Sequence, residues 1–575
     1  MAQLILAIHT GSHDAAAAVF EDYSLRAAVS LERLTRHKND GRTYPDVCID
    51  EVLAIVGAAR ADVDVISWSR SEFPTRYYKT IRGVRWLREQ YRKHVEKNTR
   101  RFMLAELRRY HTASAEDVFD VARFKTAGGF RADAATLFYN HHEAHALAAL
   151  FYTPWDEALL VTADAGGDSV HYSHRHFTGD ALTTIYGGDE CLLGPQPVDS
   201  LGWAYAHATA ALGFIPFRHE GKLTGLAAFG QPTLQERIAA HFSVDAAGRV
   251  HSDFGDYRAM SAFIAGLFRD ARREDAAASI QAVLEETMLL SVKRLLERHP
   301  SRHLGLAGGV FANVKLNRRL AEELPLDEVF IFPAMGDEGL PAGGALCHLL
   351  QRDGLPHWLG QRHRLRDMNL GRDYTDAIDV RLEEVPGVNR TAEPPAEGAA
   401  RRLEAGEIGA IYTGRMEYGP RALGARSILA NPSRRDTHDL LNHRLSRSEF
   451  MPFAPVVIAE QAAQVFDVNA VNAYACRFMT MTCNVKPQWR DRLAAVVHVD
   501  GSARPQIIER EANPLYYDIL VAFERLSGLP VLVNTSFNVH EEPIVNQPAE
   551  CRQALADGRI DFVVTTRGIY ERTKI

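Results

Sequence analysis

The sequence predicts an α/β protein of two domains, and three observations lead to this prediction. The chain has 575 residues, more than a single domain of about 150 residues would need. Short strand-like runs alternate with helical stretches along most of its length, and in the second half they are Ile408–Tyr412, Val456–Ile458, Ala495–Val499 and Leu529–Val533. A charged stretch with several prolines interrupts this alternation at residues 363–396. We therefore expect a first domain at residues 1–362, a linker at 363–396 and a second domain at 397–575.

The composition is that of an ordinary globular protein. Hydrophobic residues make up 46% and charged residues 24% of the chain, which excludes a disordered, a collagen-like and a membrane-embedded protein. The apolar start is interrupted by His9, Ser12 and His13, so it does not form the core of a signal peptide. No apolar run approaches the ~20 residues that span a bilayer. We expect a cytoplasmic protein without a membrane span.

The cysteines exclude two further classes of protein. There are six of them, scattered along the chain without a CxxC pair. This pattern argues against a disulfide scaffold and against a zinc site made of thiolates. We expect the cysteines to be reduced and mostly buried.

Two groups of three short strands, each with polar residues in its first turn, indicate an internal duplication. Such a duplication is typical of the actin-like, sugar-kinase-like architecture, in which a nucleotide lies between two related α/β halves. Unrelated α/β proteins also contain repeated hairpins. The first group is Leu4–Ile8, Ala15–Phe20 and Leu25–Leu31, and the second is Ala158–Val161, Val170–His176 and Leu182–Tyr186.

Glycine-rich turns in the predicted first domain are candidates for a nucleotide site. A strand at His303–Leu306 is followed by a glycine turn and then by a helix near Asn313. Glycines let the backbone approach a nucleotide, and the first turn of a helix offers unpaired N–H groups to an anion. A plain strand-to-helix turn explains these residues equally well. The candidate nucleotide contacts are Gly166, Gly167, Asp168, Gly308, Gly309 and Asn313.

Two histidines and two aspartates form a candidate metal site. His141 and His145 are four residues apart before an apolar helical run, so they share one helix face. Asp164 and Asp337 each follow a predicted strand of the same domain. Two imidazoles and two carboxylates suit iron, manganese or zinc, and these residues do not decide among the three metals. The alternative is a pair of buried or capped histidines without a metal.

The predicted second domain begins with an arginine- and glycine-rich segment that favours a phosphate site. Arg415, Arg421 and Arg426 lie within 12 residues, and guanidinium groups bind phosphate oxygens in a two-pronged way. Their spacing does not put them on one helix face, so we expect a loop that wraps an anion. Arg504 follows a later strand, and Asn534–Asn538 ends another with short hydrogen-bonding side chains. Ordinary capped turns explain these last two segments equally well.

A basic stretch, Arg76–Tyr110, stands out from the acidic remainder of the chain. It carries 12 lysines and arginines against three glutamates, and the rest of the chain has a net charge of −16. The aromatic residues among these cations indicate one or two helices. They either form a solvated face or recruit an anionic acceptor. The acidic remainder speaks against a broad nucleic-acid surface.

Taken together, these motifs resemble the O-carbamoyltransferases of the nodulation, cephamycin and aminoglycoside type. The resemblance extends over nearly the whole chain, and its most specific parts are the GPRALGxRS and NTSFN segments. The matching segments are His13-Asp14, Glu32-Arg33 with Arg36, His141–His145, Gly221-Lys222 with Gly225–Ala227, Gly414–Ser427, Pro452–Pro455, Asp500–Gln506, Asn534–Asn538 and Glu542–Val545.

The resemblance implies an actin-like first domain, similar to the tRNA threonylcarbamoyl-transfer proteins, and a YrdC-like second domain. The second domain would convert carbamoyl phosphate and ATP, which brings Mg²⁺, into carbamoyl adenylate. The first domain would pass the carbamoyl group to a hydroxyl of a small-molecule, sugar or natural-product acceptor at its metal site, with AMP released. Catalytic positions are His13, Lys38 and Lys222, and positions for carbamoyl phosphate and ATP are Arg415, Arg421, Arg426, Arg447, Arg504, Asn534, Thr535, Ser536 and Asn538.

One segment departs from the family pattern. Many members read Lys-x-Arg-Glu-x-Phe-Arg-Pro-Phe where this chain has Leu445–Phe453. Arg447 keeps the first arginine, but Leu445 and Met451 replace the lysine and the second arginine. The phosphate contacts of this segment therefore stay open.

Three other functions were weighed against this prediction. Carbamoyl or threonylcarbamoyl transfer to RNA is supported only by the basic stretch. Nickel-hydrogenase maturation requires zinc fingers with paired cysteines, which this sequence lacks. A non-catalytic nucleotide-dependent switch of actin-like fold leaves the arginine-rich segment unexplained. The sequence identifies neither the acceptor nor the oligomeric state.

Overall fold

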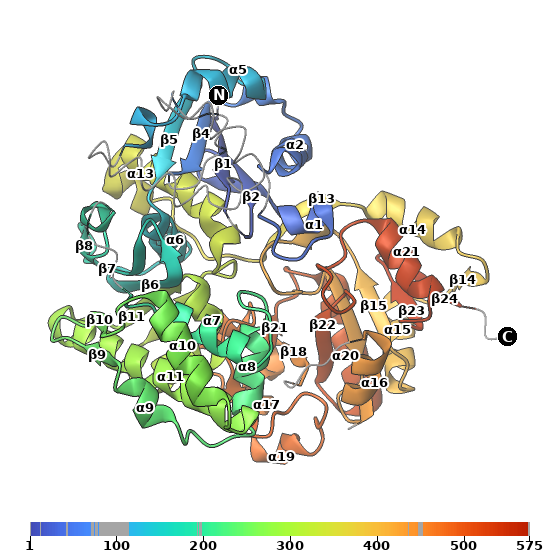
Figure 1. Cartoon of the computed structure of the whole chain (residues 1–575). Helices are drawn as coiled ribbons and strands as arrows, with labels where there is room; N and C mark the ends of the chain where they lie inside the picture. The colour runs from blue at the N-terminus through green and yellow to red at the C-terminus, as the bar shows by residue number, and fades with distance from the viewer. Residues whose placement is uncertain are drawn as a thin grey trace. The chain divides into compact units, whose positions relative to one another are not determined.

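A computed structural model describes residues 2–11, 13–41, 44–70, 74, 77, 79, 114–192, 194, 198–434, 436–446 and 452–572. Its contacts divide the chain into two compact units (Figure 1). The first unit comprises residues 1–220, 231–312 and 324–364. The second comprises residues 221–230, 313–323 and 365–575.

The first unit contains two five-stranded sheets with the same strand order. The first sheet has the order β3-β2-β1-β4-β5, and the second the order β8-β7-β6-β11-β12. In both sheets the first three strands along the chain form antiparallel pairs, and the last two add in parallel. This repeated topology confirms the internal duplication predicted from the hairpins. The strands are β1 (Leu4–His9), β2 (Ala16–Glu21), β3 (Ser24–Ser30), β4 (Val65–Ser69), β5 (Ala135–Tyr139), β6 (Ala158–Gly167), β7 (Val170–Phe177), β8 (Leu182–Tyr186), β11 (His303–Ala307) and β12 (Glu328–Ile331).

In the first unit, two helices each follow a strand of one sheet along the chain but pack on the other sheet. Helix α6 (His141–Phe151) follows β5 of the first sheet but packs on β6 and β11 of the second. Helix α13 (Leu340–Leu359) follows β12 of the second sheet but packs on β1 and β4 of the first. The two helices also pack against each other, and a Cβ atom added at Gly343 would lie 1.9 Å from the carbonyl oxygen of Ala144. A residue without a side chain is therefore required at this crossing.

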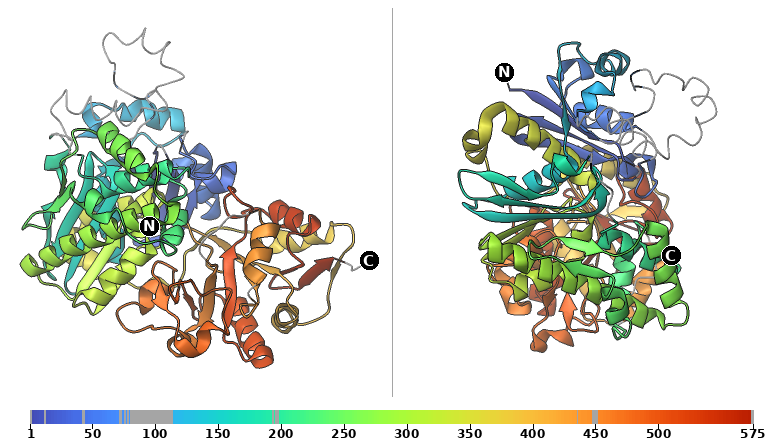
Figure 2. Two further views of the ribbon diagram at one scale, coloured as in Figure 1. Left: turned by 60° about the horizontal axis from the view of Figure 1, so that its bottom comes forward. Right: turned by 60° about the vertical axis from the view of Figure 1, so that its left-hand side comes forward.

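The remaining described helices before α13 belong to the first unit, except for α12 and nearly all of α8, which belong by their contacts to the second. Figure 2 shows the two sheets from two further directions, with β1–β5 in blue and β6–β8 in teal. On the first sheet, Trp68 and Phe124 form the centre of an aromatic core, with ring centroids 4.6 Å apart. The elements are α1 (Leu31–Thr35), α2 (Asp46–Ile55), α5 (Val121–Gly128), α7 (Leu201–Ala211), α8 (Glu220–Ala227), α9 (Gln235–Ala239), α10 (Tyr257–Phe268), α11 (Arg273–Arg298), α12 (Val314–Glu323) and the hairpin β9 (Phe242–Val244) and β10 (Val250–Ser252).

The second unit is built on a mixed eight-stranded sheet of order β14-β24-β23-β15-β17-β22-β18-β21. The pairs β15–β23 and β18–β21 are parallel, and the other pairs are antiparallel. Its strands are β14 (Val388–Arg390), β15 (Gly409–Tyr412), β17 (Arg426–Ala430), β18 (Ala454–Ile458), β21 (Gln506–Ile508), β22 (Val531–Ser536), β23 (Phe562–Val564) and β24 (Ile569–Arg572).

Two short strand pairs and several helices complete the second unit. The pairs are β13 (Asn369–Asp373) with β16 (Arg415–Glu417), and β19 (Cys483–Asn484) with β20 (Ser502–Ala503). The helices are α14 (Thr375–Glu383), α15 (Pro395–Glu404), α16 (Asp436–Arg444), α17 (Ala459–Val465), α18 (Ala473–Cys476), α19 (Pro487–Arg490), α20 (Pro514–Ser527) and α21 (Pro548–Ala556).

The predicted α/β class is confirmed, and one predicted strand is wrong. Residues Ala495–Val499, predicted as a strand, form turns in which Val496 donates to the carbonyl of Leu493. Their apolar side chains are mostly buried without a strand partner, so burial rather than pairing explains the apolar run. The stretch predicted as a linker, residues 363–396, contains β13, α14 and β14. The predicted domain boundaries stay a prediction.

Two further expectations are met within the described part of the chain. All six cysteines are reduced, and five of them are buried. No helix among the described residues is long and apolar enough to cross a bilayer.

Candidate functional site

Four side chains of the first unit converge on one point. The candidate metal ligands His141, His145, Asp164 and Asp337 are buried, and their ligand atoms lie within 4.8 Å of one another. Nε2 of His145 lies 3.2 Å from Oδ2 of Asp164 and 3.8 Å from Oδ1 of Asp337. Nε2 of His141 lies 3.3 and 3.6 Å from the same two oxygens. The structure thus brings together the four residues that the sequence predicted as ligands.

The start of α6 presents the two histidines. Asn140 caps the helix, because its side-chain oxygen accepts a hydrogen bond from the backbone N–H of Glu143 (3.1 Å). The backbone N–H of His141 donates to Oδ2 of Asp168 (3.0 Å). That oxygen also accepts from Nε of Arg70 (2.9 Å), in a buried ion pair. These hydrogen bonds fix the first turn of α6, which carries the candidate ligand His141.

Glycines make room for two of the ligands. A Cβ atom at Gly167 would lie 2.1 Å from the ring of His141, and one at Gly309 would lie 2.9 Å from Oδ1 of Asp164. The backbone N–H of Gly309 also donates to Oδ1 of Asp164 (3.1 Å). Asp164 itself lies within β6, close to a shift in register, whereas Asp337 follows β12 as predicted. Both glycines were predicted as nucleotide contacts, and in the structure they lie against the candidate metal ligands His141 and Asp164.

Burial and mutual charges shift the pKa values of the cluster. Burial lowers the pKa of His145, but the carboxylates of Asp164 and Asp337 outweigh this effect and raise it to about 9. Burial and the charge of Asp337 raise the pKa of Asp164, but the contacts with His141 and His145 outweigh them and hold it below its ordinary value. Negative and positive partners thus face each other in a site with little access to water.

The residues present fit a divalent cation. Nε2 of His145 is buried and makes no hydrogen bond of acceptable angle within the described part of the chain, although Asp164 is 3.2 Å away. Ligands about 2.0–2.2 Å from a tetrahedral ion lie about 3.3 Å from one another, close to the separations seen here. The set of two imidazole nitrogens and two carboxylates is one that iron, manganese and zinc accept.

A third and a fourth histidine flank Asp337. Nδ1 of His13 lies 4.0 Å from Oδ2 of Asp337 and 3.0 Å from Oδ2 of Asp14. His9, at the end of β1, lies 3.7 Å from Oδ2 of Asp337 and is buried. Burial, opposed by the charge of Asp337, lowers the pKa of His9 to about 3. The sequence prediction included His13 but missed His9, which looks like the last residue of an apolar strand.

The remaining predicted catalytic residues lie in different units. Lys38, half-buried, follows α1 beside Asn39, whose side-chain amide donates to Oδ1 of Asp14 (2.9 Å). Lys222 lies on α8 and belongs by its contacts to the second unit. Its Nζ atom lies 3.5 Å from Nε2 of His540. The predicted catalytic roles of Lys38 and Lys222 stay a prediction.

Two other predicted nucleotide contacts have internal partners. Asp168 binds Arg70 and the backbone of His141, as described above. Asn313 caps α12, because its side-chain oxygen accepts from the backbone N–H of Leu316 (3.0 Å), and its amide lies 3.4 Å from Oγ1 of Thr224. Gly166 and Gly308 take the positive φ angles of 158° and 101°. Their contacts with a nucleotide stay a prediction.

In the second unit, Arg426 shapes a loop rather than facing outward. It is fully buried, stacks 3.7 Å from the centroid of the Tyr412 ring and donates to the carbonyls of Thr413, Gly414 and Ala425 (2.8–3.1 Å). Both terminal nitrogens therefore already have protein partners. These contacts give Arg426 a structural role, which the sequence spacing does not reveal because it depends on tertiary burial. The predicted contact of Arg426 with an anion stays a prediction.

Arg415 also has backbone partners. It donates from Nε to the carbonyl of Gly371 (2.8 Å) and from a terminal nitrogen to that of Leu370 (2.6 Å). Both acceptors belong to β13, which pairs with β16. Arg415 thus ties the arginine-rich segment to the stretch predicted as a linker.

Three distant segments meet around the loop that carries Arg421. The amide of Asn534 donates to the carbonyl of Ala422 (3.0 Å) and to Oε1 of Gln506 (2.6 Å). Gln506 in turn donates to the carbonyl of Leu423 (2.8 Å). Arg421 follows β16 and Arg504 precedes β21, and both are half-buried. The predicted phosphate-binding segments are therefore joined by hydrogen bonds into one cluster.

The rest of the NTSFN segment ends β22. Thr535 and Ser536 pair with Ile428 and Ser427 of β17. The hydroxyl of Ser536 donates to the side-chain oxygen of Asn538 (2.6 Å). Arg447 and nearly all of the basic stretch Arg76–Tyr110 lie outside the described residues.

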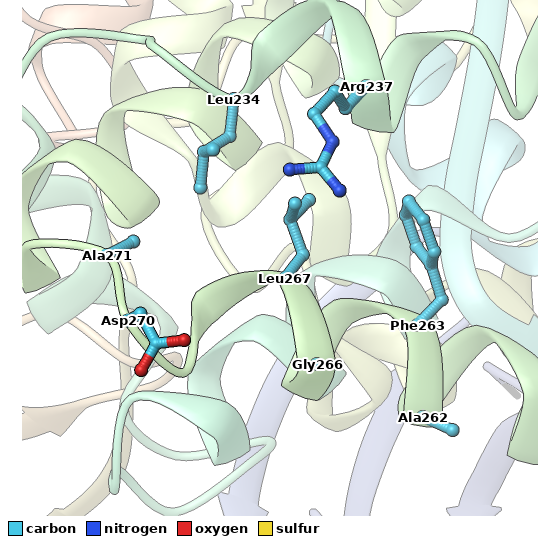
Figure 3. A pocket seen from close by; sticks show the side chains of 8 residues that line it. All are labelled: Leu234, Arg237, Ala262, Phe263, Gly266, Leu267, Asp270 and Ala271. Carbon is cyan, nitrogen blue, oxygen red and sulfur yellow. The ribbon is translucent and has the colours of Figure 1, made fainter.

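A surface pocket of about 550 Å³ lies elsewhere in the first unit, beside α9 and α10 (Figure 3). It contains none of the predicted site residues. Its lining residues are Leu234, Arg237, Ala262, Phe263, Gly266, Leu267, Asp270 and Ala271.

Comparison with known proteins identifies the family. Residues 4–346 match the family described as carbamoyltransferase N-terminus, and residues 400–572 match the carbamoyltransferase C-terminus. The chain belongs to the carbamoyltransferase family. Being a carbamoyltransferase, it is an enzyme that moves a carbamoyl group from a donor to an acceptor.

Relatives of this carbamoyltransferase include nodulation proteins. It is 30% identical to nodulation protein NolNO of Sinorhizobium fredii, over 97% of this chain and 78% of that protein. It is 32% identical to nodulation protein NolO of Bradyrhizobium diazoefficiens, over 74% and 76% of the two chains. A solved ROK hexokinase from Thermus thermophilus matches 61% of this chain and 100% of its own, with 13% identity and a TM-score of 0.33. At that level the hexokinase adds nothing to the description of the fold.

Proposed function

We propose that this carbamoyltransferase is an ATP-dependent O-carbamoyltransferase that works in two stages. The C-terminal part, which we propose to be YrdC-like, hydrolyses carbamoyl phosphate with one water to carbamate and phosphate. The carbamate oxygen then bonds to the α-phosphorus of ATP, which gives carbamoyl adenylate and releases pyrophosphate. The N-terminal part, which we propose to be actin-like, passes the carbamoyl group to a hydroxyl of a small-molecule, sugar or natural-product acceptor.

The single observation that carries this proposal is the cluster of His141, His145, Asp164 and Asp337. A buried set of two imidazoles and two carboxylates is suited to hold iron(II), manganese or zinc. When bound, such a cation supplies Lewis acidity toward the oxygen atoms of the reactants. The duplicated sheet topology supports the actin-like assignment of the same part.

In the transfer step, the acceptor oxygen forms a bond to the carbamoyl carbon. The bond from that carbon to the phosphate oxygen breaks, and AMP leaves with the electron pair. We assign the proton of the acceptor hydroxyl to His13, because its imidazole is partly exposed and adjoins Asp337 without belonging to the four-residue cluster. To the cation of Lys38 we assign the offsetting of negative charge on the leaving phosphate.

The adenylate-forming stage is assigned to the cluster around Arg421. Asn534 and Gln506 bind the loop of Arg421, and Arg504 stands two residues before Gln506. Guanidinium groups at this junction suit the phosphates of carbamoyl phosphate and of ATP with its Mg²⁺. Lys222, whose Nζ lies 3.5 Å from Nε2 of His540 in the same unit, stays a proposed catalytic position outside this cluster.

Pyrophosphate–ATP isotope exchange tests the first stage. The native enzyme should exchange label only in the presence of carbamoyl phosphate. Arg421→Ala should abolish exchange, because loss of a charge-assisted phosphate contact costs ~1.5–3 kcal/mol or more. Arg492→Ala is the matched control: Arg492 stacks on Trp489 in the same unit and was not assigned to phosphate, so exchange should continue.

Two results would contradict this assignment. Exchange at the native rate in Arg421→Ala would show that Arg421 does not bind phosphate. Exchange that does not depend on carbamoyl phosphate would remove the first stage as written.

A further inference from the structure

His9 is a buried histidine to which neither the sequence nor the proposed reaction gives a role. It is the last residue of β1, the central strand of the first sheet, and only 1% of its surface is exposed. Neither ring nitrogen has a hydrogen-bond partner among the residues that the structure describes. A buried polar ring without a partner is rare in native proteins and calls for an explanation.

The backbone on both sides of His9 is fixed by side chains. The hydroxyl of Tyr139 donates to the carbonyl of Ile8 (2.8 Å), and the indole N–H of Trp68 donates to Oγ1 of Thr10 (3.0 Å). His9 itself pairs with Ala16 in the β1–β2 ladder. The imidazole is therefore held in place by a rigid element rather than by a loop.

The ring of His9 faces the outer oxygen of Asp337. Oδ1 of this carboxylate lies toward His141 and His145, at 3.6 and 3.8 Å. Oδ2 lies 3.7 Å from Nε2 of His9 and 4.0 Å from Nδ1 of His13. Of these two outer neighbours His13 is partly exposed, with 31% of its side chain accessible, whereas His9 is enclosed.

We propose that His9 is a positioning residue of the metal centre, which orients Asp337 through the oxygen that does not face His141 and His145. The proposal rests on the metal centre of the proposed function. With Nε2 protonated, the imidazole offers its N–H to Oδ2 and leaves Oδ1 to the metal. His9 is not itself one of the four converging ligands. Partners of this kind fix the orientation of metal ligands, and their loss costs about 10- to 100-fold in metal affinity.

The test compares Zn²⁺ binding by apo-proteins in competition with a chromophoric chelator. His9→Leu keeps a similar volume but has no N–H, and its Kd should rise about 10- to 100-fold. His9→Gln restores a side-chain N–H and should regain most of the affinity. His174→Leu is the matched control, because His174 is another fully buried histidine whose ring nitrogens have no partner within the described residues. Its Kd should be unchanged.

Several outcomes would overturn the proposal. These are native Zn²⁺ affinity in His9→Leu, no recovery in His9→Gln, or an equal loss in His174→Leu. Should His9→Leu not fold, His9→Met takes its place against His9→Gln.

A second measurement uses the absorption bands of the Co²⁺-loaded protein, which should keep their positions in His9→Gln. Bands that show a changed number of ligands in His9→Gln would mean that His9 is itself a ligand. Full Zn²⁺ binding by His145→Ala would show that the four residues do not form a metal centre. That result would contradict the proposed function, whereas the outcomes above contradict only the role of His9.

Discussion

At the scale of single residues, the ion pair of Arg70 and Asp168 links stability to the candidate site. Asp168 accepts from Nε of Arg70 and from the backbone of His141, while a terminal nitrogen of Arg70 lies 2.8 Å from Asp189. Burial lowers the pKa of Arg70, but the charge of Asp168 and the contact with Asp189 outweigh it and raise the pKa above its ordinary value. Arg70 therefore stays charged, and its carboxylate partners are needed to compensate it.

Asp168→Asn should lower the free energy of unfolding by ~3 kcal/mol, because it leaves a buried guanidinium with one counter-charge fewer. Urea denaturation followed by circular dichroism measures this change. The control is Asp327→Asn, in the exposed pair with Arg302, which should hardly move the midpoint. Equal effects of the two substitutions would mean that burial of the Arg70 pair is irrelevant to stability.

His145→Ala should separate the two proposed stages. The variant should lose bound metal and transfer to the acceptor, because one of four converging ligands is missing. It should keep carbamoyl-phosphate-dependent exchange, which is assigned to the other unit. Elemental analysis and the two activity assays measure these properties in one preparation. If the variant lost pyrophosphate exchange as well as transfer, the assignment of the two stages to different units would be contradicted.

The sequence predicted the four converging residues for a physical reason. The spacing of His141 and His145 fixes a shared helix face, and Asp337 follows β12 at the edge of its sheet, whereas Asp164, predicted after a strand, lies within β6 near a shift in register. The role of Arg426 was not predictable, because an arginine among glycines looks the same whether it binds an anion or buried carbonyls. His9 was missed because its neighbours in sequence are apolar, and its partner Asp337 is more than 300 residues away.

At the scale of elements, the crossing of α6 and α13 depends on a glycine. Gly343→Ala should destabilise the protein by about 1–3 kcal/mol or more, because the new Cβ meets the backbone of α6 rather than a movable side chain. Gly266→Ala on α10 is the control, since nothing lies within 4 Å of its Cβ position. That variant should be more stable by about 0.5–1 kcal/mol, through better helix propensity. Thermal unfolding of both variants decides the point, and a neutral Gly343→Ala would show that the helices can separate freely.

The strands of the two predicted hairpin groups and β11 were predicted from sequence because hydrophobic runs bounded by turn residues mark them. The failures have a common cause. Ala495–Val499 is mostly buried but forms turns. The short strands β13 and β14 lie in a polar, proline-containing stretch, and its residue pattern alone predicts a linker. Pairing with distant partners, Arg415–Glu417 for β13 and β24 for β14, makes those residues strands.

At the scale of the whole molecule, the second unit includes strands β13 and β14 of the stretch predicted as a linker. A fragment of residues 397–575 lacks β13, which accepts both hydrogen bonds of Arg415, and β14, which pairs with β24. We expect this fragment to show no cooperative transition in urea. A fragment of residues 365–575 should regain one, at a lower midpoint than the full chain, because the contact of Asn317 with the carbonyl of Thr480 is missing. Cooperative unfolding of 397–575 would contradict this.

The exchange of α6 and α13 between sheets has a consequence for synthesis on the ribosome. The strands of the first sheet emerge early, but the helix that covers β1 and β4 begins only at Leu340. At about 5–20 residues per second, the apolar face of that sheet is uncovered for roughly 10–40 s between the synthesis of β5 and the start of α13. The nascent N-terminal half therefore exposes an apolar surface during this interval, and a chaperone that shields it should raise the yield of folded enzyme.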